Sequence, residues 1–418
     1  MSRFIIEGGH PLNGEIEVAA NKNAVLPMMA AALLTDEDCF LDNVPAIADV
    51  GAMVSILADL GATVEHVDSQ VKINCAGVSS FHPPENLVER LRASIVLMGP
   101  LLARFGRANM HHPGGDAIGT RSINTHMHAF RDMGARFEVD DNLYSAFAPP
   151  VRCDRNIFLD EASVTATENA LMFAALQPVE TVIRNAASEP HVENLAALLA
   201  DMGAHVDGAG SNVICIRGRD RLSGVRGRVW PDHVEAGTFA ALAAACQGTV
   251  SIKNVIPGHL DMVLLTLERM GVDFSIADGV MSVRPSELRA MPKIQTGIWP
   301  AFPTDLASIF LVLATQARGM TLLHDWMYEG RMFFVDKLVQ MGANIVLADP
   351  HRAVIAGISQ LRGREFVSPD IRAGIALVMA ALIASGPSQI DLIELIDRGY
   401  ERIDVRLQGI GAEIQRID

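Results

Sequence analysis

Residues 50–67 read VGAMVSILADLGATVEHV, in which an amphipathic stretch runs through Leu60-Gly61-Ala62 into alternating apolar and polar residues. The same step of a large apolar residue, a glycine and a small residue recurs around Gly134, Gly203, Gly271, Gly342 and Gly411. The intervals between the glycines are 73, 69, 68, 71 and 69 residues. Helical spacing before the glycine and alternation after it predict a helix that ends in a left-handed glycine and is followed by a strand. The chain is therefore predicted to contain six copies of one α/β unit of about 70 residues.

Each copy also carries an all-apolar stretch upstream of its glycine. These stretches are 24–34, 93–103, 170–176, 237–246, 306–317 and 373–385. A helix that is apolar on every side belongs in the interior of a domain. Because the chain is too long for one core, three copies sharing a core would form a domain of about 200 residues. We therefore predict an α/β fold of two similar domains with a cleft between them.

The composition restricts the class of protein. Half of the residues are apolar and 5% are aromatic, which is typical of a globular protein with an aliphatic core. The net charge of -15 argues against a nucleic-acid partner, because binding to a phosphate backbone needs clustered lysine and arginine. The longest uncharged runs, 236–252 and 373–390, contain glycine with glutamine or serine, and so we expect buried helices and no membrane partner. The N-terminus has no apolar leader, which predicts a cytoplasmic location.

Cysteine usage bears on redox state and metal binding. The five cysteines lie far apart in apolar or strand-like sequence, at Cys39, Cys75, Cys153, Cys215 and Cys246. Their odd number and wide spacing predict reduced, buried thiols. No group of cysteine and histidine has the spacing of a zinc site, and so we expect no metal.

Charged residues fall at repeated places in the copies. The predicted buried helices begin at or just after Lys22, Arg92, Glu235, Asp305 and Arg372, which lie 39, 42, 36, 37 and 39 residues before their own glycines. Arg121 and Arg398 each lie 13 residues before theirs. A helix start presents unpaired N–H groups and the positive end of the helix dipole, so an added cation makes a strong anion site. We expect a ligand with several anionic oxygens, such as phosphate plus carboxylate.

An acid at a helix start has two interpretations. Asp305 and Asp370 could act as functional groups, or they could simply cap a helix or complement its first turn. A cation at a helix start opposes the dipole and has no such structural explanation. Lys22, Arg92 and Arg372 are therefore the more informative residues.

A glycine-rich segment lies between the second apolar stretch and its glycine. Residues 111–121 read HHPGGDAIGTR, and the Pro-Gly-Gly turn signal predicts a loop. The loop holds both Asp116 and Arg121. It could be a lid over a site or a plain surface loop.

The chain resembles the UDP-N-acetylglucosamine 1-carboxyvinyltransferases from Phe4 to Ile414. The resemblance is carried by Lys22-Asn23-Ala24, Arg92-Ala93-Ser94, Pro113-Gly114-Gly115, Ala301-Phe302-Pro303-Thr304-Asp305, Glu329 with Arg331, Asp370-Ile371-Arg372-Ala373 and Asp397-Arg398-Gly399-Tyr400-Glu401-Arg402. It implies two inside-out α/β domains, each of three pseudo-repeats. The first domain would span 22–230 and carry the loop 111–121, and the second would join 1–21 to 231–418.

The resemblance also implies a reaction. That family transfers the enolpyruvyl group of phosphoenolpyruvate to the 3-hydroxyl of UDP-N-acetylglucosamine and releases phosphate, in the first committed step of peptidoglycan synthesis. This step serves cell wall biogenesis, and with it cell shape and division. Phosphoenolpyruvate and UDP-N-acetylglucosamine are then the expected partners of a monomer or weak homo-oligomer that needs no cofactor.

Residue roles follow from the same resemblance. The donor phosphate would be held by Lys22, Arg92, Arg121 and Arg398, and its carboxylate by Arg331, Arg372 and Arg398. Asp305 would be the base for the sugar hydroxyl, Asp116 and Asp370 would serve proton transfer, and Asn23, Asn124 and Met327 would complete the substrate site.

The chain departs from the family pattern at the loop. Asp116 stands where many members carry the cysteine that fosfomycin alkylates, and aspartate is a natural variant there. A carboxylate should not open the epoxide as a thiolate does, which predicts fosfomycin resistance. Protonation near neutral pH needs a raised pKa, whereas Arg92 and Arg121 would lower the pKa of Asp116, so its role as the acid stays open.

Further departures affect the nucleotide side. This chain has Glu161 where the family often has lysine, Thr165 in place of a glycine, and Asn124 in place of an aspartate. It also has Ser188 and His233 in place of arginines. Loss of cations beside a diphosphate should lower affinity. Two alternatives therefore remain. One is a paralogous enolpyruvyl transferase that uses another UDP-sugar or a shikimate-type acceptor, and the other is a non-catalytic paralogue that binds a sugar nucleotide.

Two weak motifs have simpler interpretations. Gly208-Ala209-Gly210 follows a predicted strand without opening a helix, which predicts a turn and no dinucleotide site. His126 and His128 have no acid partner nearby in the sequence, so we expect both to be structural or adjacent to the lid, and not catalytic.

Overall fold

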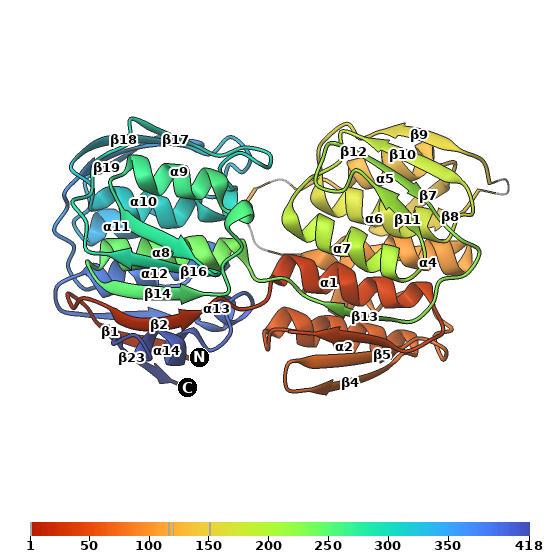
Figure 1. Cartoon of the computed structure of the whole chain (residues 1–418), viewed down its shortest axis with the longest axis horizontal. Coiled ribbons are helices and arrows are strands. Elements are labelled where there is room, and N and C mark those ends of the chain that lie inside the picture. Colours follow the sequence, from red (N-terminus) through yellow and green to blue (C-terminus); the bar gives the residue numbers. More distant parts are fainter. Residues whose placement is uncertain (1, 116–117, 120, 150–151) are drawn as a thin grey trace. The chain divides into compact units, whose positions relative to one another are not determined.

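The computed structural model describes residues 2–115, 118–119, 121–149 and 152–418. The chain divides into two compact units, each with its own hydrophobic core (Figure 1). Unit 1 comprises Met1–Ala19, Asp116–Thr120 and Pro231–Asp418, and unit 2 comprises Ala20–Gly115 and Arg121–Trp230. Among the helices of the described residues, none is both long and apolar enough to cross a bilayer.

Unit 2 has three sheets within its described residues. Their strand orders are β13-β3-β5-β4, β6-β8-β7 and β11-β12-β10-β9. The strands are β3 (Cys39–Asp42), β4 (Thr63–Val67), β5 (Gln70–Asn74), β6 (Arg107–His111), β7 (Arg136–Asp140), β8 (Leu143–Phe147), β9 (Arg155–Phe158), β10 (Glu180–Arg184), β11 (His205–Asp207), β12 (Val213–Arg217) and β13 (Val225–Arg228).

The helices of unit 2 fall into a buried set and an outer set. They are α1 (Lys22–Ala31), η1 (Ala32–Leu34), α2 (Ala48–Leu60), α3 (Glu85–Val88), η2 (Arg92–Leu97), α4 (Met98–Phe105), α5 (Asn124–Asp132), α6 (Val164–Ala175) and α7 (Pro190–Asp201). The buried helices α1, α4 and α6 pack with η2 in the interior of the unit. This packing confirms the prediction that the apolar stretches of these copies form interior helices.

Unit 1 is built in the same way. Its sheets have the orders β15-β16-β14-β2, β17-β18-β20-β19 and β21-β22-β1-β23. The strands are β1 (Arg3–Glu7), β2 (Asn13–Glu17), β14 (Thr249–Lys253), β15 (Asp273–Ala277), β16 (Val280–Arg284), β17 (Lys293–Gln295), β18 (Gly319–His324), β19 (Ile345–Asp349), β20 (Arg352–Gly357), β21 (Glu365–Val367), β22 (Pro387–Asp391) and β23 (Glu413–Ile417).

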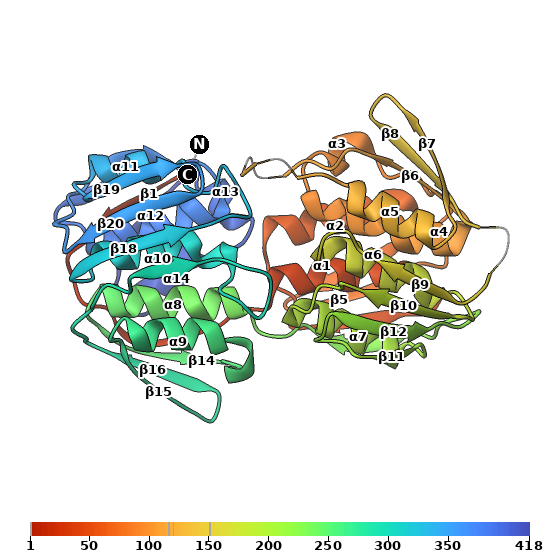
Figure 2. The same ribbon diagram turned by 90° about the horizontal axis from the view of Figure 1, so that it is seen from above.

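Three buried helices form the centre of unit 1. Its helices are α8 (His233–Ala245), η3 (Pro257–His259), α9 (Asp261–Arg269), η4 (Thr304–Leu306), α10 (Ala307–Thr315), α11 (Val335–Gln340), α12 (Ile371–Ile383), α13 (Glu394–Asp397) and α14 (Ile403–Gln408). Figure 2 shows α8, α10 and α12 side by side inside the unit, and α10 contacts both neighbours. The predicted charged positions lie at the starts of these helices: Glu235 is the third residue of α8, Arg372 is the second residue of α12, and Asp305 lies in η4 directly before α10.

The glycines that define the copies close their helices in the predicted way. Backbone φ is 107° at Gly61, 91° at Gly134, 113° at Gly203, 81° at Gly271, 104° at Gly342 and 91° at Gly411. A side chain is strained in this left-handed region, whereas glycine adopts it freely. The predicted succession of helix, left-handed glycine and strand is confirmed in every copy.

One sheet differs from the other five in its edge. Each four-stranded sheet has one edge strand that pairs in parallel, such as β13 with β3 and β17 with β18. In the three-stranded sheet no such parallel strand is described beside β6. The segment around Phe81 lies there, and the carbonyl of Phe81 accepts a hydrogen bond from the backbone N–H of Asn109 at 3.0 Å. The next residues of this segment include Pro83 and Pro84, which have no N–H to donate. The second copy therefore has a three-stranded sheet within the described residues.

Two expectations from the sequence need correction. The stretch 93–103 is not one α-helix, since η2 precedes α4, and Pro100 lies in the first turn of α4 where an N–H is not needed. The cysteines are free, but only Cys39, Cys75 and Cys246 are buried. Cys215 is half-buried because Ile214 and Ile216 take the inner face of β12, and Cys153 is exposed.

Candidate active site

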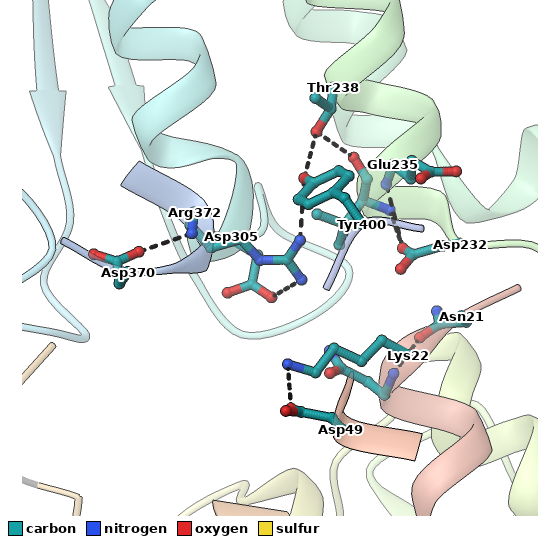
Figure 3. A network of polar contacts seen from close by, with 12 residues as sticks. Asn21, Lys22, Asp49, Asp232, Glu235, Thr238, Asp305, Asp370, Arg372 and Tyr400 are labelled. Carbon is teal, nitrogen blue, oxygen red and sulfur yellow. Dashed lines mark hydrogen bonds and ion pairs between the residues drawn. The ribbon is translucent and has the colours of Figure 1, made fainter. Parts of the chain in front are cut away.

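Asp305 lies between two buried arginines of unit 1. It belongs to η4, directly before α10. Its Oδ1 accepts a hydrogen bond from Arg331 at 3.1 Å, and its Oδ2 accepts one from Arg372 at 2.8 Å (Figure 3). The arginine side chains are 4% and 8% exposed, whereas that of Asp305 is 25% exposed. A carboxylate that reaches solvent is thus backed by two charge-assisted hydrogen bonds.

Arg372 is held by further groups in the same unit. Its Nη1 donates to the hydroxyl of Tyr400 at 3.2 Å, and that hydroxyl lies 3.2 Å from Oγ1 of Thr238. Burial lowers the pKa of Arg372, but the charges of Asp305, Tyr400 and Asp232 outweigh burial and raise it above its usual value. The guanidinium therefore remains a cation in the interior.

Asp370 caps the helix that carries Arg372. Its Oδ1 accepts from the backbone N–H groups of Arg372 at 2.7 Å and Ala373 at 2.9 Å. These two donors are among the unsatisfied groups of the first turn of α12. The capping interpretation of Asp370 is confirmed, and its part in proton transfer stays a prediction.

Lys22 is the first residue of α1 in unit 2. The side chain of Asn21 caps this helix by accepting from the N–H of Asn23 at 2.8 Å and of Ala24 at 3.3 Å. The Nζ of Lys22 lies 2.7 Å from Oδ2 of Asp49, and the two side chains are 13% and 5% exposed (Figure 3). An internal acid therefore offsets the unfavourable position of this cation at a helix start.

Arg92 anchors the loop that precedes α5. Its Nη2 donates to the carbonyl oxygens of Arg121 at 2.6 Å and Ser122 at 3.1 Å. Gly115 has φ of 123°, and a Cβ there would lie 2.7 Å from the Cβ of Arg92. Glycine at this position lets the loop pass directly over the arginine. We expected the loop to begin at His111, but His111 is the last residue of β6. The loop therefore starts at His112.

The tip of this loop has few described residues. Ile118 is buried, and its carbonyl accepts from the N–H of Gly330 at 2.8 Å within unit 1. Gly119 has φ of 137°, and a Cβ there would collide with the carboxylate of Glu329. Asp116, the predicted loop acid, lies outside the described residues.

Comparisons with known proteins identify the fold and the family. The sequence profile described as EPSP synthase (3-phosphoshikimate 1-carboxyvinyltransferase) matches residues 6–407. The enolpyruvyl transferase NikO from Streptomyces tendae has a similar fold, with a TM-score of 0.87 at 21% identity over 99% of this chain and 98% of that one. An EPSP synthase from Acinetobacter baumannii gives 0.75 at 19% identity over 100% of both chains.

Curated relatives are closer in sequence. A UDP-N-acetylglucosamine 1-carboxyvinyltransferase from Treponema denticola is 45% identical over 424 residues, covering 99% of each chain. The protein of the same name from Bacteroides fragilis is 41% identical over 436 residues, covering 100% of each. The chain belongs to the UDP-N-acetylglucosamine 1-carboxyvinyltransferase family. Like NikO and EPSP synthase, this family member has the α/β enolpyruvyl transferase fold, and its six small sheets are consistent with six repeats.

The predicted site residues of this UDP-N-acetylglucosamine 1-carboxyvinyltransferase form two groups in the structure. In unit 1, contacts join Asp305, Arg331 and Arg372, with Asp370 capping the same helix as Arg372. In unit 2, Arg92 contacts the backbone of Arg121, and Lys22 pairs with Asp49. The remaining predicted residues lie at element ends: Arg398 follows α13, Asn124 begins α5, Asn23 is the second residue of α1, and Met327 lies three residues beyond β18.

Sequence reasoning missed several groups that hold these residues. Two of them are buried acids: Asp49 contacts Lys22, and Asp325 contacts Arg331. The third is the hydroxyl of Tyr400, which accepts a hydrogen bond from Arg372. Asp49 lies 27 residues from Lys22, whereas Asp325 lies only six residues before Arg331, in a segment for which the sequence predicts no contact. The one signal in the sequence was an acidic residue next to apolar residues. Such a residue can be expected to be buried, but the sequence does not indicate which residue it contacts.

His126 and His128 contact neighbouring side chains of this member of the family. His126 is buried between Thr165 Oγ1 at 3.0 Å and Asn169 Nδ2 at 2.9 Å. Burial and the charge of Arg92 lower its pKa to about 3. His128 pairs with Asp160 at 2.8 Å on the surface. These contacts support a structural role for His126, and the role of His128 stays a prediction.

His233 does not supply the cation that it replaces. Burial, followed by nearby His259, lowers its pKa to about 3, so the ring is neutral at physiological pH. The ring packs edge-on against Trp299 with centroids 5.5 Å apart. The turn predicted at Gly208-Ala209-Gly210 is confirmed, because Gly208 and Gly210 lie between β11 and β12 with φ of 78° and 82°.

Proposed function

We propose that this enzyme transfers the enolpyruvyl group of phosphoenolpyruvate to the 3-hydroxyl of UDP-N-acetylglucosamine and releases phosphate. The observation that carries the proposal is the placement of Asp305 between two buried arginines. The product would enter peptidoglycan precursor synthesis, which is cytoplasmic. We infer a monomer or weak homo-oligomer that needs no cofactor.

The donor carries a carboxylate and a phosphate, which require separate cationic partners. Arg331, Arg372 and Arg398 would bind the carboxylate, because a guanidinium fork matches two carboxylate oxygens. The phosphate would be bound by Lys22, Arg92, Arg121 and Arg398. Four of these cations, Lys22, Arg92, Arg331 and Arg372, are already held by internal contacts, which reduces the entropy lost on binding.

Asp305 would take the proton of the sugar hydroxyl. In the described contacts both of its oxygens accept from arginines, which weakens it as a base. When both substrates are bound, the donor carboxylate would compete with Asp305 for the same arginines. Asp305 would then lose these hydrogen bonds and become a stronger base. Asn23 would bind the acetamido group, and Asn124 and Met327 would complete the acceptor site.

The reaction balances as an addition followed by an elimination. The sugar oxygen forms a bond to C2 of phosphoenolpyruvate, its proton passes to Asp305, and C3 gains a proton to become a methyl group. Loss of phosphate from C2 and of a proton from C3 then restores the vinyl group. We propose Asp116 and Asp370 for the proton transfers at C3, with Asp370 acting while its Oδ1 caps α12.

Two finer proposals concern the loop and the domains. The chain would be a loop-aspartate variant of its family, and Asp116 in place of a loop cysteine would make it resistant to fosfomycin. The domains would be 22–230, and 1–21 joined to 231–418, each an inside-out arrangement of three pseudo-repeats.

Substitution of Asp305 tests the assignment of the base. Asp305→Asn keeps the size of the side chain but cannot take a proton, so we expect turnover to fall about 100-fold or more. The affinity for phosphoenolpyruvate, measured by calorimetry, should persist. The matched control is Asp349→Asn, which removes a half-buried acid paired with Arg352 in the same unit. Turnover of Asp305→Asn equal to that of the control would contradict the assignment.

A further inference from the structure

Asp325 is a fully buried carboxylate in unit 1, directly after β18, and its exposed fraction is 0%. Its Oδ1 accepts from Thr296 Oγ1 at 2.9 Å and from the backbone N–H of Met327 at 3.0 Å. Its Oδ2 accepts from Thr304 Oγ1 at 2.6 Å and lies 3.8 Å from Nε of Arg331. A buried charge needs such partners, and here Thr296 and Thr304 come from earlier segments, whereas Met327 and Arg331 lie in the segment that follows Asp325.

The backbone around Asp325 is fixed as well. The N–H of Asp325 donates to the carbonyl of His351 at 2.8 Å, and its own carbonyl lies 2.7 Å from Nδ1 of His351. The indole of Trp326 donates to the carbonyl of Thr296 at 2.9 Å. The carboxylate therefore has a single orientation, and it can serve as a rigid reference for its neighbours.

Those neighbours belong to the proposed site. Thr304 directly precedes Asp305 in η4. Arg331 lies between the two acids, with Nη2 3.1 Å from Asp305 and Nε 3.8 Å from Asp325. Among the described residues, this Nε makes no hydrogen bond. One buried acid thus contacts both the turn that carries the proposed base and the arginine that binds it.

We propose that Asp325 is a positioning residue for Asp305 and Arg331. Its carboxylate, 3.8 Å from Nε, holds the guanidinium of Arg331 from the interior, so the arginine keeps its place when the donor carboxylate replaces Asp305 on it. Its hydrogen bond from Thr304 fixes the turn on which Asp305 stands. The inference rests on the proposed function, because it assumes that Arg331 binds the donor.

Asp325→Asn tests the electrostatic part of the proposal. The amide retains an acceptor for Thr296 and Met327 but removes the charge that faces Arg331. We expect the KM for phosphoenolpyruvate to rise about tenfold or more, with the KM for UDP-N-acetylglucosamine within about twofold of the parent. The matched control is Asp404→Asn, a buried acid that shares Arg416 with Asp397 in the same unit. A rise in the donor KM no larger than that of the control would overturn the proposal.

A double-mutant cycle separates positioning from general loss of structure. If Asp325 acts through Arg331, Arg331→Lys combined with Asp325→Asn should raise the donor KM little more than Arg331→Lys alone. Full additivity of the two effects would overturn the proposal. An unchanged donor KM in Arg331→Lys would instead contradict the assignment of Arg331 and hence the proposed function.

Thr304→Val provides a second test that keeps the carboxylate. Valine has nearly the shape of threonine but cannot donate to Asp325. We expect kcat to fall about fivefold, because the hydrogen bond to the carboxylate that fixes the turn of Asp305 is lost, with the donor KM nearly unchanged. This variant also decides the question if Asp325→Asn fails to fold. An unchanged kcat would overturn the positioning of Asp305 through Thr304.

Discussion

Lys22 and Asp49 form an ion pair across 2.7 Å in unit 2, and both side chains are almost completely enclosed. The pair explains how a cation can stand at the first position of α1, where the helix dipole opposes it. It also places the ammonium group at a fixed point before any substrate arrives.

Asp49→Asn should therefore weaken both stability and donor binding. Removal of one partner of a largely buried pair leaves the other charge poorly compensated, and we expect a loss of about 1–3 kcal/mol in the free energy of unfolding. The KM for phosphoenolpyruvate should rise because Lys22 is no longer held. Urea unfolding and steady-state kinetics measure the two effects. The control is Asp59→Asn on the exposed face of the same helix, which should change stability by less than about 0.5 kcal/mol.

Arg372→Lys should reduce catalysis while keeping the charge. Lysine is a point charge and cannot reach Asp305 and the Tyr400 hydroxyl together as the guanidinium does. We expect kcat/KM for phosphoenolpyruvate to fall about 100-fold, measured with UDP-N-acetylglucosamine at saturation. Arg352→Lys, in an exposed ion pair of the same unit, is the control and should be nearly silent. Equal activity of the two variants would argue against a role for the guanidinium fork.

A buried acid pair should make stability fall as pH rises. Burial raises the pKa of Glu189 to about 7, although backbone hydrogen bonds partly oppose the shift. Burial and the neighbouring charge of Glu189 raise the pKa of Glu168 well above 4.5. The folded state then binds more protons than the unfolded state between pH 4.5 and about 7, so the stabilisation present at low pH is lost across this window.

Glu189→Gln should remove the part of that pH dependence that Glu189 contributes, while the burial of Glu168 keeps its own part. The variant should exceed the parent in stability by about 1–3 kcal/mol at pH 8 and show no gain at pH 5. Thermal or urea unfolding at the two pH values measures the difference. The exposed acid Glu65 supplies the control Glu65→Gln, for which the difference from the parent should be the same at both pH values. A gain for Glu189→Gln that is equal at pH 5 and pH 8 would contradict the raised pKa.

Asp116→Cys tests the proposed fosfomycin resistance, because the variant should be sensitive where the parent is expected to be resistant. A thiolate opens the epoxide and forms a stable thioether, whereas a carboxylate is a much weaker nucleophile. Intact-protein mass spectrometry should find one adduct on the variant after incubation with fosfomycin and none on the parent. An adduct on the loop of the parent would show that this account of resistance is wrong.

The same variant tests the role of Asp116 as the acid. If Asp116 donates the proton, the acidic limb of the pH–rate profile should move in Asp116→Cys, because a thiol has a different pKa. An unmoved limb would assign the proton transfer to another group, and Asp370 would be the first to examine.

The repeat pattern predicted the fold because it reflects local physics. Gly61 and its five counterparts end helices in a conformation that disfavours side chains, and the all-apolar stretches have no place except an interior. Lys22, Arg92 and Arg372 could be singled out because their charges are unfavourable where the sequence places them.

The contacts between distant residues could not be predicted in this way. Asp49 lies 27 residues from Lys22, and no periodic signal joins them. Asp325 looks in the sequence like an ordinary residue at the end of a strand, and only the packing of Thr296, Thr304 and Arg331 around it reveals its environment. The three-stranded sheet of the second copy depends on Pro83 and Pro84, whose effect appears only when the neighbouring β6 is known.

The central claim is that this site joins the enolpyruvyl group of phosphoenolpyruvate to a UDP-sugar. The most direct measurement is release of phosphate from phosphoenolpyruvate, with UDP-N-acetylglucosamine or shikimate 3-phosphate as the acceptor. We predict one phosphate released for each enolpyruvyl product formed with UDP-N-acetylglucosamine, and no release above background with shikimate 3-phosphate. Release with shikimate 3-phosphate alone, or with neither acceptor, would contradict the claim.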